Sequence, residues 1–374
     1  MHIGFDASTL STQGGPRTYV QGLLDALLQL DRENRYTVFY NDPSHLGRFP
    51  QANEVVLPGK KPLARLWREH LLLPAACRRE GIDLLHCPKS AIPFRAPCPV
   101  VVTLHDLIPL KHPETEKLAA RLYWRLQIPI AARRSSYIIT DSEHARQEIM
   151  ADFDVPADRI RAVMLGFDPR MIEPRDPATG AEVRARYGLP EQYLLYVGTI
   201  QPRKNIATLI EAFSLLKKEQ GMSNRLVIVG RKGWLYDQLF ARISELGLAE
   251  EIIFTGFVPD EDLPFIYDGA RVFAYLSLFE GFGLPPLEAM ACGVPVVTSN
   301  TTSLPEVVGE AGITLPPTDI KAVQDALWRV LSDSALRETM CRSGAARARQ
   351  FSWEAAARET LAIYRNVVHA EQIN

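Results

Sequence analysis

Short apolar runs alternate along the chain with longer segments in which apolar residues recur at helical spacing. The runs are rich in Val, Ile and Leu, which is typical of strands buried on both faces. Because helical segments separate consecutive strands, the pattern predicts parallel sheets covered by helices, an α/β fold. Six strands are predicted in the first half and five in the second, at 2–7, 35–41, 82–87, 99–106, 136–142 and 160–166, and at 193–200, 225–230, 251–256, 271–278 and 294–299.

The helical segments and a proline-rich connection divide the chain into two doubly wound halves. Predicted helices include 18–30, 64–80 with an interruption at Pro74, a basic helix at 114–134, and a helix that Asn205 would cap. Further helices are expected from about residue 319 to the end, with breaks near 334 and 351. The segment 166–192 contains four prolines and is predicted to connect the domains.

Composition excludes several protein classes. A chain of 374 residues with 47% hydrophobic and 23% charged residues is typical of a globular protein of two domains. The net charge of −2 argues against a nucleic-acid partner, and five cysteines without CxxC spacing indicate reduced thiols. We find neither a signal peptide nor an apolar stretch long enough to cross a bilayer, so we expect a cytoplasmic protein.

Charge is concentrated in one region. Residues 60–134 contain fourteen Lys and Arg against six Asp and Glu. Such a region can contact anionic lipid or phosphate, or it can be the solvated side of ordinary helices. The sequence leaves both interpretations open, and a contact with the cytoplasmic face of a membrane is one prediction.

Polar residues and glycines follow the predicted strands, at the sheet edge where open α/β folds bind ligands. The glycines allow the backbone to come close to a ligand, and adjacent cations and carboxylates stand beside them. Such a set suits a ligand that has a diphosphate and several hydroxyls. The set is Gly14-Gly15, His86, His105-Asp106, Gly198, Arg203-Lys204, Gly230-Arg231-Lys232-Gly233, Gly256 and Glu280.

The segment GTIQPRKN contains the adjacent cations. Gly198 ends a strand, Pro202 stiffens the turn, and Arg203 and Lys204 precede a predicted helix. A helix N-terminus favours anions, and a guanidinium with an ammonium adds phosphate-binding groups. The alternative is an ordinary pair of surface cations.

The segment LFEGFGLPPLEAMACGVPVV contains two carboxylates. Glu280 is predicted to end a strand, and the following prolines are predicted to start a helix with Glu288 in its first turn and Gly293 as its C-cap. Both carboxylates would then accept hydrogen bonds from sugar hydroxyls at one sheet edge. The alternative for Glu288 is a favourable interaction with the helix dipole.

Residues 280–288, EGFGLPPLE, match the E-x7-E motif of retaining glycosyltransferases with the GT-B fold, and the chain resembles glycosyltransferase family 4. The resemblance covers nearly the whole chain. It rests on GG at 14–15 with Tyr19, HD at 105–106, DSEHARQEI at 141–149, VGTIQPRKNIATLIEAF at 197–213, VIVG at 227–230, FTGFVPDEDL at 254–263 and FSWEAAA at 351–357.

The resemblance implies two doubly wound, Rossmann-like domains that face each other across a cleft. The helix after Trp353 would cross back, so residues 1–172 with 352–374 would bind the acceptor and residues 173–351 the nucleotide-sugar donor. It implies catalytic roles for Glu280, Arg203, Lys204 and His105. It implies donor contacts for Gly15, Gly198, Phe257, Val258, Phe282, Gly283, Leu284 and Glu288.

The implied reaction transfers a hexose from a nucleotide-diphosphate sugar with retention, to a glycan or a polyprenyl-diphosphate-linked acceptor. Residues 104–114 resemble mannosyltransferases of surface-polysaccharide pathways, which favours GDP-mannose over UDP-hexoses. No metal is expected, since Arg203 and Lys204 would stabilise the leaving group. The Asp-x-Asp segments at 152–154 and 260–262 are interpreted as a loop and as helix N-cap acids.

Two other functions remain open on the same fold. A nucleotide-sugar epimerase would convert the donor alone, and a non-catalytic subunit would bind nucleotide without turnover. Dinucleotide-binding GxGxxG, P-loop, HExxH and GxSxG motifs are missing from the sequence. His86 and His105 lack a third metal ligand at regular spacing, so packing or substrate contact is favoured for them.

Overall fold

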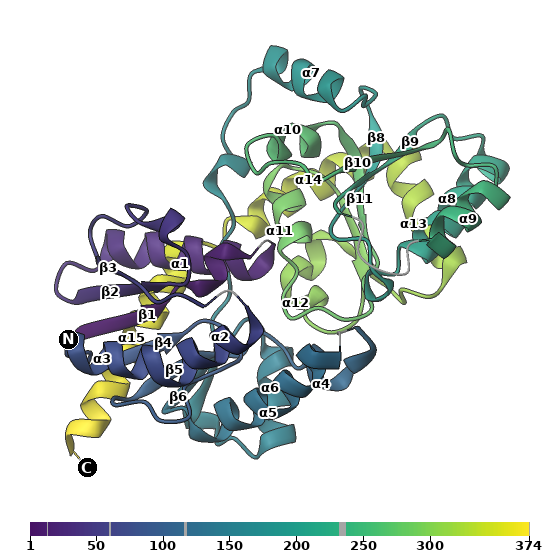
Figure 1. Ribbon diagram of the computed structural model, residues 1–374. Helices are drawn as coiled ribbons and strands as arrows, with labels where there is room; N and C mark the ends of the chain where they lie inside the picture. Colours follow the sequence, from purple (N-terminus) through teal and green to yellow (C-terminus); the bar gives the residue numbers. More distant parts are fainter. Residues whose placement is uncertain (13, 60, 116–117, 232–236, 374) are drawn as a thin grey trace. The chain divides into compact units, whose positions relative to one another are not determined.

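The computed structural model describes residues 1–374 except 13, 60, 116–117, 232–236 and 374 (Figure 1). The chain forms two compact units, Met1–Gly166 with Phe351–Asn374, and Phe167–Gln350. We call them the N-terminal and the C-terminal unit. The boundaries predicted from the sequence, after residues 172 and 351, lie close to these.

A seven-stranded parallel sheet forms the centre of the N-terminal unit, in the order β3-β2-β1-β4-β5-β6-β7. Its apolar strands are buried, as continuous Val, Ile and Leu runs require. The strands are β1 (His2–Asp6), β2 (Arg35–Tyr40), β3 (Asn53–Val56), β4 (Leu84–Cys87), β5 (Val100–Thr103), β6 (Tyr137–Thr140) and β7 (Ile160–Ala162).

Helices cover this sheet. They are α1 (Gly15–Leu30), α2 (Pro62–Trp67), α3 (Leu73–Glu80), α4 (Ile108–Lys111), α5 (Leu118–Arg134), α6 (Glu143–Phe153) and α15 (Trp353–Ile373). The interruption predicted near Pro74 takes the form of one π-helical turn, η3 (Arg68–Leu72), which separates α2 from α3, and Pro74 lies in the first turn of α3. The predicted loop at 152–154 is wrong, because α6 extends to Phe153.

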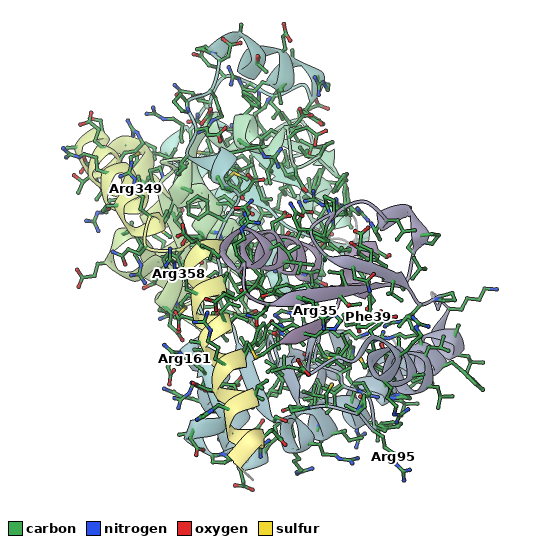
Figure 2. All side chains as sticks on the ribbon, turned by 90° about the vertical axis from the view of Figure 1, so that its left-hand side faces the viewer. Arg35, Phe39, Arg95, Arg161, Arg349 and Arg358 are labelled. Carbon is green, nitrogen blue, oxygen red and sulfur yellow. The ribbon has the colours of Figure 1, made fainter. Side chains whose placement is uncertain are left out.

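The last helix, α15, belongs to the N-terminal unit and packs along α1 (Figures 1 and 2). Gly22 permits this contact, since a Cβ there would lie 2.2 Å from the indole of Trp353. Arg161 forms an ion pair with Glu359, and Tyr364 bonds to His86 of β4 with an O–N distance of 2.6 Å. The return of the C-terminal helix, implied by the family resemblance, is present.

The C-terminal unit has a six-stranded parallel sheet in the order β10-β9-β8-β11-β12-β13. Its strands are β8 (Tyr193–Val197), β9 (Arg225–Val229), β10 (Ile252–Gly256), β11 (Ala270–Tyr275), β12 (Val296–Ser299) and β13 (Ile313–Leu315). Its helices are α7 (Pro177–Arg186), α8 (Ile206–Gln220), α9 (Asp237–Glu245), α10 (Leu263–Asp268), α11 (Leu284–Ala291), α12 (Leu304–Val308), α13 (Ile320–Ser332) and α14 (Ser334–Ala348).

All eleven predicted strands are present, and two edge strands, β3 and β13, were not predicted. Asn205 occupies the N-cap position of α8, but its side chain does not cap the helix. Its backbone is left-handed, and its amide bonds to Thr208 and to the carbonyl of Pro317 instead.

Candidate active site

The carboxyl ends of β8 and β11 bring three predicted residues of the C-terminal unit together. Arg203 and Lys204 lie in a 3-10 turn, η7 (Pro202–Lys204), and the backbone N–H of Leu278 donates to the carbonyl of Arg203 at 2.8 Å. Glu280 forms an ion pair with Arg203 at 3.1 Å and another with Lys204. Arg203 and Lys204, for which the sequence predicts contacts with phosphate, therefore contact the glutamate in this structure.

Tyr275 completes this cluster and was not predicted. Its hydroxyl accepts from the Lys204 ammonium and donates to Glu280 at 2.9 Å. Tyr275 is the last residue of β11, and its ring stacks on that of Tyr196, whose centroid lies 5.8 Å away. The sequence could have indicated Tyr275, because this strand ends at the ligand edge and alternate residues of a strand point to the same face of the sheet.

The electrostatics of Glu280 follow from these contacts. Burial alone would raise its pKa, but the charges of Arg203 and Lys204 lower the pKa to about 2. Lys204 is only 7% exposed. Two cations, Arg203 and Lys204, thus contact one largely buried carboxylate, Glu280.

The loop between Tyr275 and α11 carries Glu280 beyond the strand, so the prediction that Glu280 ends the strand is wrong. The hydroxyl of Thr302 accepts from the backbone N–H of Glu280 at 3.2 Å, and Ser303 donates to the carbonyls of Glu280 and Phe282. Gly283 has φ +125, and a Cβ there would lie 2.8 Å from Leu304. Main chain at 280–284 is thus fixed by its neighbours.

Glu288 lies in the second turn of α11, not in the first as predicted, which removes the simple helix-dipole interpretation. The hydroxyl of Tyr267 donates to its carboxylate at 3.0 Å. Burial raises the pKa of Glu288 to about 7, with Asp260 and Asp168 adding to the rise. The predicted C-cap is confirmed: Gly293 has φ +71 and closes a Schellman motif.

The remaining donor residues predicted in this unit follow β8 and β10. Gly198 has φ +153, and Phe257 is half exposed beneath the guanidinium of Arg231, 4.7 Å from its ring centroid. Val258 is buried. Arg231, which the sequence places among the residues at the ligand edge, thus lies beside Phe257, whereas Lys232 and Gly233 of the same segment lie outside the described residues. In the 260–262 segment, Asp262 occupies the predicted N-cap position of α10, but its side chain bonds to Arg186 and Tyr187 and makes no capping hydrogen bond.

In the N-terminal unit, His105 follows β5. Its Nδ1 bonds to Asp141, which follows β6, at 2.7 Å, and its ring packs edge-on against Tyr19. Burial lowers the pKa of His105, but Asp141 outweighs it and the net shift is upward. Asp141 therefore orients the imidazole and favours its protonated form, a role that sequence reasoning missed.

Gly14 and Gly15 begin α1. Gly14 has φ +82, a backbone conformation that favours glycine over other residues. A Cβ on Gly15 would meet no atom within 4 Å, so the fold itself does not require glycine there. The first turn of α1 contains no acidic residue, which leaves its N-terminal dipole available to an anion.

His86 belongs to the core. It is fully buried, bonds to Tyr364 and Thr103, and its pKa is lowered to about 3 by burial. Packing is therefore its role. Among the residues that the structure describes, there is no group of three or more His, Cys, Asp or Glu able to bind a metal ion.

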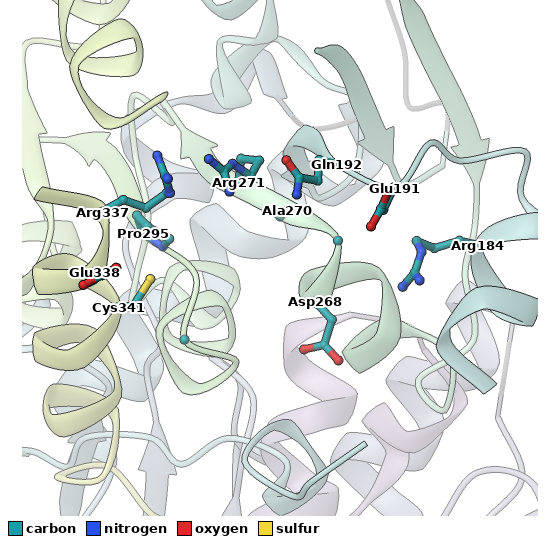
Figure 3. Close-up of a pocket in the computed structure, with 12 residues that line it drawn as sticks. Arg184, Glu191, Gln192, Asp268, Ala270, Arg271, Pro295, Arg337, Glu338 and Cys341 are labelled. Carbon is teal, nitrogen blue, oxygen red and sulfur yellow. The ribbon is translucent and has the colours of Figure 1, made fainter. Parts of the chain in front are cut away.

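A cavity of about 360 Å³ lies at the opposite edge of the C-terminal sheet, where strands begin (Figure 3). Gln192 and Pro295 precede β8 and β12, and Ala270 begins β11. None of the predicted site residues lines it. In the part of the chain that the structure describes, no helix is both long and apolar enough to span a membrane.

Comparison with known proteins identifies the family. Residues 13–170 match the family model "Glycosyltransferase Family 4", and residues 182–347 match "Glycosyl transferases group 1". O-antigen chain mannosyltransferase B of Escherichia coli is 42% identical over 284 residues, which cover 75% of this chain and 74% of that protein. The chain belongs to the family 4 glycosyltransferases. The prediction of a glycosyltransferase is thus confirmed.

Two further comparisons bear on length and fold. Serotype-specific mannosyltransferase WbdA of Escherichia coli is 32% identical over 272 residues, 71% of this chain but only about a third (33%) of that protein. The structure of Anabaena Alr3699/HepE in complex with UDP and glucose matches with a TM-score of 0.77 and 20% identity, over 98% of this chain and 100% of that one. The second likeness confirms the predicted GT-B fold.

Proposed function

We propose that this glycosyltransferase moves mannose from GDP-mannose to a glycan or a polyprenyl-diphosphate-linked acceptor, with retention at the anomeric carbon, in polysaccharide or glycolipid synthesis. The names of two relatives support mannose. A UDP-hexose is the second candidate donor, supported by the UDP and glucose in the HepE structure. A cytoplasmic location and a contact of residues 60–134 with an anionic membrane stay predictions.

The buried Arg203–Lys204–Glu280 cluster carries the proposal. A guanidinium beside an ammonium suits an incoming diphosphate. In the proposal, the diphosphate takes over part of the contacts of Arg203 and Lys204, and Glu280 then accepts hydrogen bonds from the hexose. Glu288 contacts the ribose, Phe257 and Val258 the base, and the main chain of Gly198, Phe282, Gly283 and Leu284 the sugar and phosphates.

The proposed chemistry needs no covalent intermediate. The bond between the anomeric carbon and the donor phosphate oxygen breaks, and the two cations neutralise the charge that develops on the departing nucleotide. The acceptor oxygen bonds to the same face of the carbon while its proton passes to a donor phosphate oxygen. Glu280 is a weak nucleophile because two cations stabilise its carboxylate, and those cations supply the charge that a metal would otherwise bring.

The N-terminal unit has the acceptor-side role in this proposal. Asp141 orients the imidazole of His105 and raises its pKa. His105 would donate a hydrogen bond to a hydroxyl near the reacting carbon. Gly15 and the first turn of α1 would approach the diphosphate.

Proton NMR of slow donor hydrolysis tests the proposal without a known acceptor. With GDP-mannose, we expect the α anomer of mannose to appear first, faster than hexose from UDP-glucose. First appearance of the β anomer would contradict retention. An epimerase would instead yield a new nucleotide sugar, and a non-catalytic subunit would shift in thermal stability with GDP-mannose but release no GDP.

A further inference from the structure

Exposed apolar side chains gather on two helical segments of the N-terminal unit. Leu63, Leu66, Trp67 and Leu71 are exposed on α2 and η3, at the spacing of one side of a helix. These residues leave apolar surface in water on the outer side of that segment. Its inner side carries the buried residues Arg68 and Glu69.

Helix α5 repeats the arrangement. Leu118, Leu122 and Leu126 recur every fourth residue and are exposed, whereas Ile128, Ala131 and Ala132 are buried in the core. A helix with apolar residues on two sides has more apolar surface than its own core accounts for.

Three contacts join the two segments. Arg65 lies over the ring of Tyr123, 4.0 Å from its centroid. The Tyr123 hydroxyl donates to Glu69 at 2.6 Å, and Gln127 contacts His70 at 3.0 Å. Because α5 lies beside α2 and η3, the two sets of exposed apolar residues belong to neighbouring segments, and we call them together the apolar face.

Cations border the apolar face. Lys61, Arg95 and Arg125 are exposed and Arg121 is half exposed. Arg95 projects into solvent in Figure 2. No ion pair joins any of the four to a carboxylate among the described residues, whereas the glutamate in this region, Glu69, is buried and paired with Arg65 and Lys89. Exposed apolar side chains and cations that form no ion pair therefore occur together in this region of the described chain.

We propose that the apolar face inserts into the interface of an anionic phospholipid bilayer, with the bordering cations at the headgroup phosphates. Leucines with a tryptophan favour the interface, and unpaired cations favour an anionic surface over an acidic or neutral protein partner. The inference gives the predicted membrane contact a defined surface, and it is independent of the donor site.

Vesicle flotation of the full chain tests the proposal. Vesicles of equal parts phosphatidylglycerol and phosphatidylcholine should bind the protein, and salt or phosphatidylcholine alone should weaken binding. The double variant Leu122→Ser/Leu126→Ser should bind at least about tenfold more weakly, since burial of one leucine contributes about that factor. Leu46→Ser is the matched control, because Leu46 is 52% exposed against 62% and 54% for Leu122 and Leu126.

Several results would overturn the proposal: no binding to the anionic vesicles, equal binding by the double variant, or a lipid-free dimer that the double variant abolishes. Vesicles should shift the tryptophan emission to shorter wavelength, and this shift should disappear in Trp67→Phe. The same shift in Trp67→Phe as in the unaltered protein would also overturn the proposal. Hydrolysis of GDP-mannose in solution should be unchanged in the double variant, which separates this result from a failure of the proposed function.

Discussion

Among single residues, Glu280 and Lys204 belong to the candidate ligand site and also form a nearly buried ion pair on which stability depends. Both are nearly buried, and each is the other's charge partner. Removing one member of a buried ion pair leaves an uncompensated charge and typically costs about 3–5 kcal/mol, whereas removing both costs much less.

We therefore predict that Glu280→Gln, which takes the carboxylate from both cations, destabilises the C-terminal unit by about 2–4 kcal/mol, and that Lys204→Met, which keeps the Arg203–Glu280 pair, costs less. The double variant should lose less stability than the sum of the two single losses. Urea denaturation with a double-mutant cycle measures this coupling. Additive losses would show that the two charges do not depend on each other.

Glu288 is predicted to behave in the opposite way. Its raised pKa, about 7 against an ordinary 4.5, means that the folded state is favoured fully below pH 4.5 and loses that stability as pH rises to 7. Above pH 7, Glu288→Gln should therefore have a free energy of unfolding about 1–2 kcal/mol higher than the unaltered protein, a modest value because the group is half-buried. The variant should accordingly unfold at a higher temperature. Thermal melts from pH 5 to 8 check this; the same pH dependence in both proteins would contradict it.

Sequence reasoning predicted the residue types of the site better than their contacts. Glu280, Arg203 and Lys204 stood out because carboxylates and adjacent cations follow strands at the ligand edge. Their pairing could not be predicted, because 76 residues separate Lys204 from Glu280 and only the sheet order brings them together. The contact of His105 with Asp141, 36 residues later, was missed for the same reason.

At the scale of elements, the packing of α15 on α1 depends on one glycine. A Cβ at Gly22 would overlap the indole of Trp353. We predict that Gly22→Ala destabilises the N-terminal unit by about 1–3 kcal/mol, because a packed interface cannot take the added methyl group without shifting. Gly15→Ala, in the same helix but without a neighbouring atom, is the control for urea denaturation. Equal stability of the two variants would contradict the packing argument.

Element boundaries were predictable where local chemistry decides them. Pro285 and Pro286 at the start of α11 and Gly293 at its end were readable from the sequence. The edge strands β3 and β13 were not, because each has only three or four residues and gains its partner from the neighbouring strand. The π form of η3 was also not predictable, since its buried residues Arg68 and Glu69 contact residues that are distant in the sequence, Asp6 and Lys89.

At the scale of the molecule, the chain passes through the C-terminal unit and ends in the N-terminal one. Tyr364 is fully buried against His86, and Ile363 and Val367 are buried beside it. We predict that a chain ending at residue 350 loses hydrogen-exchange protection in the N-terminal sheet, while β8 to β13 keep theirs. Unchanged protection of β1 and β4 would show that α15 is dispensable.

The central claim is that the buried cations of the Arg203–Lys204–Glu280 cluster stabilise the departing nucleotide. The most direct measurement is the initial rate of GDP release from GDP-mannose by the unaltered protein, by Lys204→Ala and by Lys217→Ala. Lys217 is a matched control, because it is also a nearly buried lysine in an ion pair, with Glu251 in the same unit. We predict that Lys204→Ala lowers the rate by about 10²–10³ and that Lys217→Ala leaves it within about threefold. Equal rates in the two variants would contradict the account.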